Sequence, residues 1–181
     1  MKRILAHILY YTGILHCLLK LRSLDKNKLY ILAYHRVVDD QHAPEFEDGL
    51  ISVNTENFSR QLKVIKKYYD VVNFKMLDKS NSRSRIIVTF DDGYYDNYSK
   101  AYKLIKKNNL TATMYITVEN INEGKMFWFD YVYKSLINLP AGDMYLESLN
   151  LYTKLNGSLS ERKEIASEIM KNSKLYQIAE G

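Results

Sequence analysis

The sequence predicts an α/β fold in which parallel strands alternate with helices, and three observations predict it. Apolar stretches of strand-forming residues, at 29–34, 85–91 and 111–118, are separated by segments with helical periodicity. The order strand, helix, strand, helix, strand is typical of βαβ units, whose strands lie parallel in one sheet. The chain of 181 residues is 46% hydrophobic and 26% charged, so it can bury a core and does not have a disordered composition.

The first 24 residues predict one amphipathic helix, ahead of a single domain over residues 25–181. Apolar residues recur at helical spacing between positions 4 and 19, and the ends of the segment carry Lys2, Arg3, Lys20 and Arg22. The apolar run is shorter than the roughly 20 residues that span a bilayer, and it lacks the small-residue cleavage site of a signal peptide. The helix either lies on a membrane surface through residues 2–22 or packs on the domain, and both alternatives stay open.

The next predicted elements are a strand, a loop and a helix. The apolar run from Leu29 to Tyr34 predicts a buried strand, and the polar residues 39–50 predict a loop. Asn54 or Thr55 then caps a helix. The apolar face of that helix consists of Phe58, Leu62 and Ile65.

The middle of the chain predicts three further strands and a helix. Residues 70–74 predict a short strand, and residues 85–91 predict the clearest strand because nearly all of them are strand formers. A polar connection joins these two strands. A helix follows, with an apolar face of Tyr98, Ala101, Tyr102 and Ile105, and it leads into the strand over residues 111–118.

The last third of the chain has a different character. Residues 127–139 are aromatic and predict a helix. Two more helices are predicted over residues 143–155 and 160–178, and no further strand is expected before the last residue.

The charge balance and the cysteine count limit which partners and which cellular location we expect. The chain has 26 basic and 21 acidic residues, a formal net charge of +5, and the basic residues are scattered. This mild excess fits weak attraction to anionic lipid or glycan and predicts no nucleic-acid partner. The single cysteine, Cys17, excludes an intramolecular disulfide. We expect the chain in the cytoplasm or at the periphery of the inner membrane, and export stays open.

The candidate catalytic residues lie at the end of the predicted strand over residues 85–91. The run Thr89-Phe90-Asp91-Asp92-Gly93 places two carboxylates at the carboxyl end of a strand, where α/β folds bind ligands. One carboxylate there can bind a cation while the other takes a proton from a water. Two other interpretations stay open: a turn that caps the next helix without chemistry, and a Mg²⁺ site for phosphoryl transfer.

Several segments, in order along residues 30–130, resemble a known family. Thr89 to Gly93 resembles the first motif of the polysaccharide deacetylases, the NodB homology domain of carbohydrate esterase family four. The segments that resemble one bacterial branch of this family are Tyr34-His35-Arg36-Val37, Tyr94 to Tyr98 (Y-Y-D-N-Y), Thr111 to Tyr115, and Phe127-Trp128-Phe129-Asp130. The resemblance implies the N-terminal half of a deformed, TIM-like (β/α)7 barrel with parallel strands, here with extra helices.

The resemblance also implies a reaction, the metal-dependent hydrolysis of N-acetyl (or O-acetyl) groups on a glycan with release of acetate. Asp91 would be the general base, and Asp92 would be a ligand of Zn²⁺ or another divalent metal. Tyr94 is a candidate contact for the polysaccharide substrate. Trp128 is another, because aromatic rings stack on sugars, and the alternative for Trp128 is a helix that packs on the barrel. An enzyme of this kind is a hydrolase that acts on carbon–nitrogen bonds other than peptide bonds.

The histidines depart from the family pattern. The family's second motif brings two His ligands downstream of the first motif, whereas the four histidines here all precede Asp91: His7, His16, His35 and His42. Asp92 would then be a lone ligand, although a catalytic zinc usually has three protein ligands. We therefore expect a truncated domain, or one completed by a C-terminal partner chain, with little or no activity alone. The alternative is a non-catalytic glycan-binding or assembly module, so whether the chain is an enzyme stays open.

Overall fold

The structure, a computed structural model, describes residues 2–39, 51–78, 80–147 and 151–179. The chain forms two compact units. The first unit comprises Met1–Asp39 and Ile51–Thr117, and the second comprises Asp40–Leu50 and Val118–Gly181. The loop predicted over residues 39–50 lies outside the described residues, except for Asp39. The domain boundary predicted at residue 24 stays a prediction.

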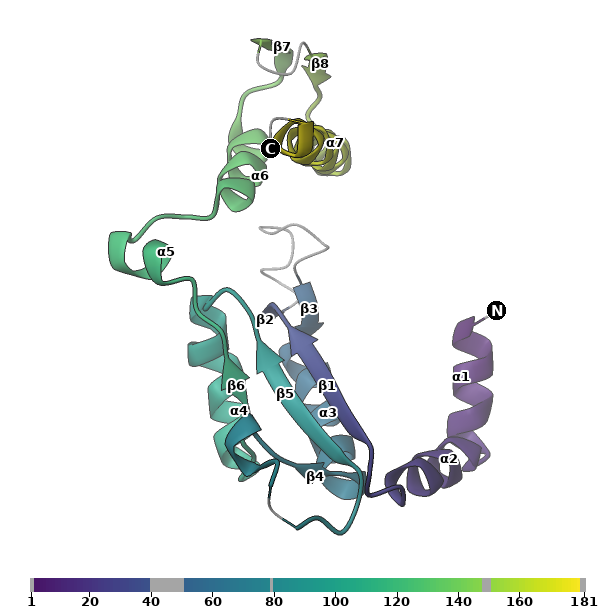
Figure 1. Ribbon diagram of the computed structural model, residues 1–181. Coiled ribbons are helices and arrows are strands. Elements are labelled where there is room, and N and C mark those ends of the chain that lie inside the picture. Colours follow the sequence, from purple (N-terminus) through teal and green to yellow (C-terminus); the bar gives the residue numbers. More distant parts are fainter. Residues whose placement is uncertain (1, 40–50, 79, 148–150, 180–181) are drawn as a thin grey trace. The chain divides into compact units, whose positions relative to one another are not determined.

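A parallel sheet is the centre of the first unit (Figure 1). Its central strand, β5 (Arg85–Phe90), pairs along its whole length with β1 (Leu29–Tyr34). On the other edge, β5 pairs at its start with β4 (Asp70–Val71) and at its end with β6 (Thr113–Met114). The predicted α/β fold with parallel strands is confirmed, although the strands expected over 70–74 and 111–118 are each only two residues long.

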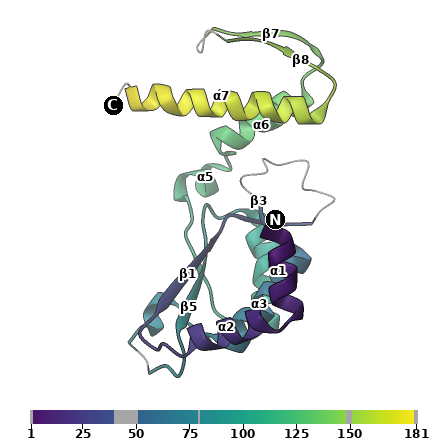
Figure 2. The same cartoon turned by 90° about the vertical axis from the view of Figure 1, so that its right-hand side faces the viewer.

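Helices pack on one face of this sheet and close the core of the first unit (Figure 1, Figure 2). They are α3 (Thr55–Tyr68) and the helix after β5, which begins as a π-helix (η3, Asn97–Tyr102) and continues as α4 (Lys103–Lys107). Three rings stand at the centre, with centroid distances of 5.1 to 5.8 Å: Tyr34, Phe58 and Phe90. Side chains of this size stabilise a fold by roughly 1.5–3 kcal/mol each when fully buried.

The N-terminus of α3 begins as the sequence predicts. The Asn54 side chain caps the helix by accepting a hydrogen bond from the Asn57 amide at 2.8 Å. The predicted apolar face is confirmed, because Phe58, Leu62 and Ile65 are all buried.

The helix after β5 does not present the face that the sequence predicts. Tyr98 and Tyr102 are 64% and 48% exposed, and their rings stack on each other at 5.9 Å. The residues that face the core are Asn97, Ala101 and Ile105. A π-helix has more residues per turn than an α-helix. Side chains four residues apart therefore stay on one face, and side chains three residues apart turn away from it.

The predicted N-terminal helix is wrong in one respect, because the structure has two helices there. Helix α1 (Lys2–Tyr11) and helix α2 (Ile14–Ser23) meet at Gly13, whose φ of 76° is left-handed and ends helical hydrogen bonding. Within the described residues, no helix is long and apolar enough to cross a membrane.

The second unit contains a hairpin where the sequence predicts a helix. Strands β7 (Gly142–Leu146) and β8 (Leu151–Leu155) pair antiparallel, so the helix predicted over residues 143–155 and the expected absence of further strands are both wrong. Tyr145 and Tyr152 stand opposite each other and are exposed, whereas alternate residues pack inward, which is the two-residue period of a strand. The helices of this unit are α5 (Val118–Glu123), α6 (Trp128–Asn138) and α7 (Leu159–Ala179).

A buried arginine ties the second unit together. The Arg162 side chain donates hydrogen bonds to the carbonyls of Leu136 and Ile137, at 3.1 and 3.2 Å, and to that of Asn156 at 2.7 Å. The first two carbonyls belong to the last turn of α6, where a helix has no partners of its own for its carbonyl groups. Arg162 therefore joins the end of α6 to the segment between β8 and α7.

Candidate active site

The two aspartates lie in a tight turn at the carboxyl end of β5. The Asp91 amide donates to the Tyr34 carbonyl at 3.0 Å, which extends the pairing with β1 by one residue. The chain then turns back, because the Gly93 amide donates to the Asp91 carbonyl at 2.9 Å. Asp92 and Gly93 both have left-handed φ values, 71° and 81°. The turn takes Asp92 out of the strand direction directly after a buried strand.

A left-handed conformation costs a residue other than glycine on the order of 1 kcal/mol. Asp is among the residues that tolerate it, and such conformations gather at functional sites. Asp91 and Asp92 are both half-buried. Neither carboxylate makes a hydrogen bond or an ion pair within the part of the chain that the structure describes. Their oxygens are therefore available to a ligand.

A buried ion pair holds the loop that follows the aspartates. Arg36, the first residue of β2 (Arg36–Val38), donates from Nε to the Asp96 carboxylate at 2.9 Å, and its Nη2 lies 2.7 Å from the same oxygen. The Val37 amide donates to the other oxygen of Asp96 at 3.0 Å. The two charged side chains are only 11% and 7% exposed. Strand β2, which itself pairs in parallel with β3 (Ile51–Asn54), is thus fastened to the start of the helix after β5.

Tyr94 lies in the same loop and contacts the same arginine. The Arg36 guanidinium stands over the Tyr94 ring, with its central carbon 4.2 Å from the ring centroid. Tyr94, one of the two predicted substrate contacts, follows the aspartates in the sequence. In the structure its ring contacts the arginine of the ion pair. Trp128, the other, begins α6 in the second unit, where its ring meets Phe129 edge to face at 5.8 Å.

Asp96 and Asn97 are two residues of this site that the sequence did not single out. Asp96 is the partner of Arg36, and Asn97 is buried with no hydrogen-bond partner for its side chain among the described residues. A buried amide without partners is uncommon and calls for an explanation such as an unseen ligand or water. The only signal in the sequence is their position within the Y-Y-D-N-Y segment.

The structure describes the side chains of two of the four histidines, His16 and His35. His35 is half-buried between β1 and β2, one residue beyond the last register pair of β1 and β5. His16 lies on α2 and contacts the Tyr68 hydroxyl, next to the end of the sheet where β4 begins. His42 and the side chain of His7 lie outside the described residues.

The described residues do not bring together the donors of a catalytic zinc site. Nowhere in residues 2–39, 51–78, 80–147 and 151–179 do three or more His, Cys, Asp or Glu side chains come together in a way that could hold a metal ion. A catalytic zinc usually has three protein ligands. The carboxylates of Asp91 and Asp92 therefore do not fit a complete metal site by themselves.

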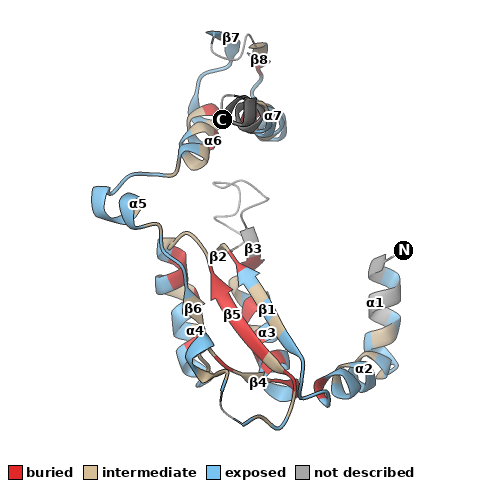
Figure 3. Ribbon diagram, viewed as in Figure 1, coloured by how far each residue is buried: buried red, intermediate tan, exposed pale blue. Residues whose placement is uncertain are grey.

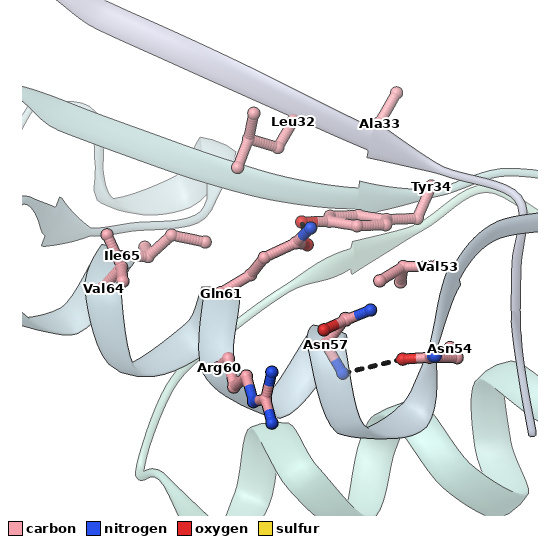
Figure 4. Close-up of a pocket in the computed structure, with 10 residues that line it drawn as sticks. All are labelled: Leu32, Ala33, Tyr34, Val53, Asn54, Asn57, Arg60, Gln61, Val64 and Ile65. Atoms are coloured by element: carbon pink, nitrogen blue, oxygen red, sulfur yellow. Dashed lines mark hydrogen bonds between the residues drawn. The ribbon is translucent and has the colours of Figure 1, made fainter. Parts of the chain in front are cut away.

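A hollow of about 730 Å³ lies between β1 and α3 (Figure 4). Leu32 and Tyr34 point from β1 toward the helix, and the Tyr34 hydroxyl donates to the Gln61 side chain at 2.7 Å. Burial raises the pKa of Tyr34 above its ordinary value, so the phenol stays protonated. Asp91 and Asp92 do not line this hollow. Among the described residues, β1 has a strand partner on one side only.

Comparisons with known proteins bear on this site. A sequence model described as polysaccharide deacetylase matches residues 78–172, just over half of the chain. YxkH of Bacillus subtilis (strain 168), which its name marks as a candidate polysaccharide deacetylase, is 43% identical over 44 residues, or 24% of this chain and 16% of that protein.

Solved structures of deacetylases are also similar. A polysaccharide deacetylase from Bacillus cereus is 28% identical, with a TM-score of 0.44, over 60% of this chain and 35% of that chain. A de-N-acetylase from Aggregatibacter actinomycetemcomitans is 23% identical, with a TM-score of 0.41, over 71% of this chain and 45% of that chain. The chain thus spans less than half the length of these relatives.

Proposed function

Because the chain belongs to the polysaccharide deacetylase family, we propose that it takes part in the hydrolysis of N-acetyl groups on a polysaccharide. The observation that carries this proposal is the pair of carboxylates, Asp91 and Asp92, which make no bond to the described residues and lie in a left-handed turn at the carboxyl end of the central strand. Parallel α/β folds bind their ligands at that end. The family match over residues 78–172 includes the turn.

Each carboxylate has a proposed role. Hydrolysis of an amide needs a base that takes a proton from the attacking water, and we assign this role to Asp91. Asp92 would be one ligand of Zn²⁺ or another divalent metal, which when bound polarises the acetyl carbonyl. Since the described residues do not complete a metal site, the other ligands would come from elsewhere.

The Arg36–Asp96 pair supports this assignment as a positioning element. It fixes the loop of residues 91–97 against β2 through two charge-assisted contacts and one amide contact. The same guanidinium stacks on the Tyr94 ring and fixes its orientation. We propose Tyr94 as a substrate contact, and Trp128 as a separate candidate for a sugar contact.

We also propose that the sheet is part of a deformed (β/α)7 barrel completed by a further polypeptide segment, such as a C-terminal partner chain. Two observations support this. Strand β1 pairs on one edge only within the described residues, and the hollow beside it is lined mainly by apolar atoms of β1 and α3. An unpaired strand edge is a template for another strand. Figure 3 shows the contrast: β5 is buried except at its first residue, whereas β1 alternates between exposed and half-buried residues before the buried Tyr34.

Release of acetate from N-acetylglucosamine oligomers tests the proposed function. The full chain is incubated with the oligomers, with and without added Zn²⁺, next to Asp91→Asn and Asp92→Ala. We expect slow release that depends on added metal and is lost in both variants. Asp70→Asn, which alters a carboxylate at the opposite end of the sheet, is the matched control and should leave the rate unchanged.

Two results would contradict the proposal. Release that survives both Asp91→Asn and Asp92→Ala would refute the site. Rapid release by the chain alone that Asp92→Ala abolishes would refute the need for a completing segment.

A non-catalytic glycan-binding module is the second candidate, and the absence of a three-ligand metal cluster from the described residues favours it. Binding of the same oligomers, followed by calorimetry, separates the two. Affinity that is unchanged by a chelator and by Asp92→Ala, with no acetate released, would support the binding module.

A further inference from the structure

Helices α1 and α2 each expose an apolar stripe to solvent. Ile4, Ile8 and Tyr11 follow one another on α1 at spacings of four and three residues, and Ile14, Leu18 and Leu21 repeat this spacing on α2. Such spacing places side chains on one face of a helix. Their exposed fractions run from 46% at Leu18 to 80% at Tyr11. Six large apolar side chains therefore stay in water within 18 residues.

The stripe on α2 is not the face that packs on the protein. His16 contacts the Tyr68 ring edge to face at 5.1 Å, Leu19 packs against the core of the first unit, and Ser23 is buried. At about 100° per residue, these three positions lie on the side of the helix opposite to Ile14, Leu18 and Leu21. The inner face of α2 is thus occupied already, and the outer stripe is an additional apolar surface.

The charge of this segment is of one sign. Residues 1–24 contain Lys2, Arg3, Lys20 and Arg22 and no acidic residue. On α2, the helical angles place Arg22 beside the outer stripe, about 70° from its centre, and Lys20 nearer the inner face, about 130° from it. Basic side chains that flank an apolar face are the pattern of helices that lie in a membrane interface.

We propose that the outer faces of α1 and α2 form a docking surface for an anionic lipid bilayer. The apolar stripes enter the boundary between head groups and acyl chains, and the basic side chains contact lipid phosphates. Each helix has 10 residues, so it is about 15 Å long and can lie in the interface without crossing a hydrocarbon core of about 30 Å. The left-handed Gly13 joins the two helices and lets each present its stripe. The docking needs no catalytic activity.

Sedimentation with vesicles tests this proposal on the full chain. Vesicles of equal parts phosphatidylglycerol and phosphatidylcholine are compared with pure phosphatidylcholine, at low and high salt. We expect binding to the anionic vesicles, weaker binding to the neutral ones, and a loss of binding at high salt. Replacing Ile14, Leu18 and Leu21 together by Asn should weaken binding about tenfold or more, and so should Lys20→Glu with Arg22→Glu.

Matched variants elsewhere on the surface provide the controls. Val118→Asn, Ile121→Asn and Met126→Asn remove exposed apolar side chains from the second unit, and Lys106→Glu with Lys107→Glu reverses two exposed charges on α4. Neither set should change vesicle binding by more than about twofold, apart from the small effect of net charge. Circular dichroism of each variant confirms that it is folded.

Two results would overturn the proposal: no binding to anionic vesicles, or an equal loss of binding in the control variants. If the chain binds no vesicles and light scattering shows a dimer that the triple Asn variant dissociates, a second copy of the chain covers the stripes.

Discussion

The two ends of the parallel sheet differ in how their carboxylates are bonded. At the end where the strands begin, Asp70 accepts hydrogen bonds from the Ser82 amide at 2.7 Å, the Arg83 amide at 3.0 Å and the Arg83 Nε at 3.1 Å. At the end where the strands finish, Asp96 is similarly engaged by Arg36. Asp91 and Asp92, five and four residues before it, have no such partners in the described part of the chain.

This comparison separates carboxylates that hold the fold from carboxylates that are available to a ligand. A carboxylate bonded to backbone amides and an arginine has its acceptor positions filled, so its removal leaves donors unpaired. A half-buried carboxylate without partners contributes little to folding and retains its acceptors. Substitutions at the four positions should therefore fall into two groups.

The largest effect is expected for Asp96→Ala. It leaves the Arg36 guanidinium buried without its counter-charge, which typically destabilises a protein by about 3–5 kcal/mol. Urea denaturation followed by circular dichroism measures the change. Asn97→Ala is the control, because Asn97 is also buried but its side chain has no hydrogen bond to any of the described residues. Equal losses in the two variants would show that the ion pair is unimportant for the fold.

Asp70→Asn should cost about 1–2 kcal/mol at pH 7, since a neutral amide accepts the Ser82 and Arg83 hydrogen bonds less strongly. Desolvation raises the pKa of Asp70, but the hydrogen bonds from Arg83 and Ser82 outweigh it and leave the pKa below its ordinary value of 3.8.

The sign of this shift fixes the pH dependence. A group with a lowered pKa stabilises the folded state at pH values above its ordinary pKa. This contribution to stability is lost as the pH falls through the pKa of the folded state. The difference in stability between Asp70→Asn and the unaltered chain should be constant from pH 7 to about pH 5 and shrink below about pH 4. A difference that grows with acidification would contradict this assignment.

Asp92→Gly should stabilise the chain by about 0.5–1 kcal/mol, because glycine adopts the left-handed φ of 71° without steric cost. Thermal unfolding measures this as a small rise in Tm. The reciprocal control is Gly93→Ala, which should lower stability by about 1 kcal/mol at a φ of 81°. A destabilised Asp92→Gly would show that its carboxylate is bonded after all.

Asp91→Asn is expected to have the smallest effect, within about 0.5 kcal/mol, since the side chain has no partner in the described part of the chain. The same urea denaturation measures it. If it destabilises the chain as much as Asp70→Asn does, the distinction between the two ends of the sheet fails.

Local sequence patterns predicted the elements that are set by residue propensity, capping and apolar spacing within a few residues. Strand β5 was predicted because five successive strand formers precede Asp91, and α3 because Asn54 caps a helix with a regular apolar face. The hairpin of β7 and β8 was missed because Met144, Leu151 and Leu155, at spacings of seven and four residues, fit a helical face as well as a strand face. Pairing with β8 and packing in the core of the second unit select the strand.

At the site, the sequence located Asp91, Asp92 and Tyr94 through their motif but not the Arg36–Asp96 pair. These two residues are 60 positions apart, so no local pattern connects them. Charged residues are mostly exposed, and only the meeting of β2 with the loop after β5 buries this pair.

The sequence by itself determined that the chain has parallel strands alternating with helices, and that two carboxylates follow the central strand. Strand propensity, capping and helical spacing act over a few residues, so they can be read without coordinates. Only the tertiary structure decided which carboxylates are bonded, where the π-helix rotates its tyrosines into solvent, and which face of α2 stays apolar and uncovered. Those features depend on contacts between residues far apart in the chain. A local sequence pattern does not show which of these contacts form.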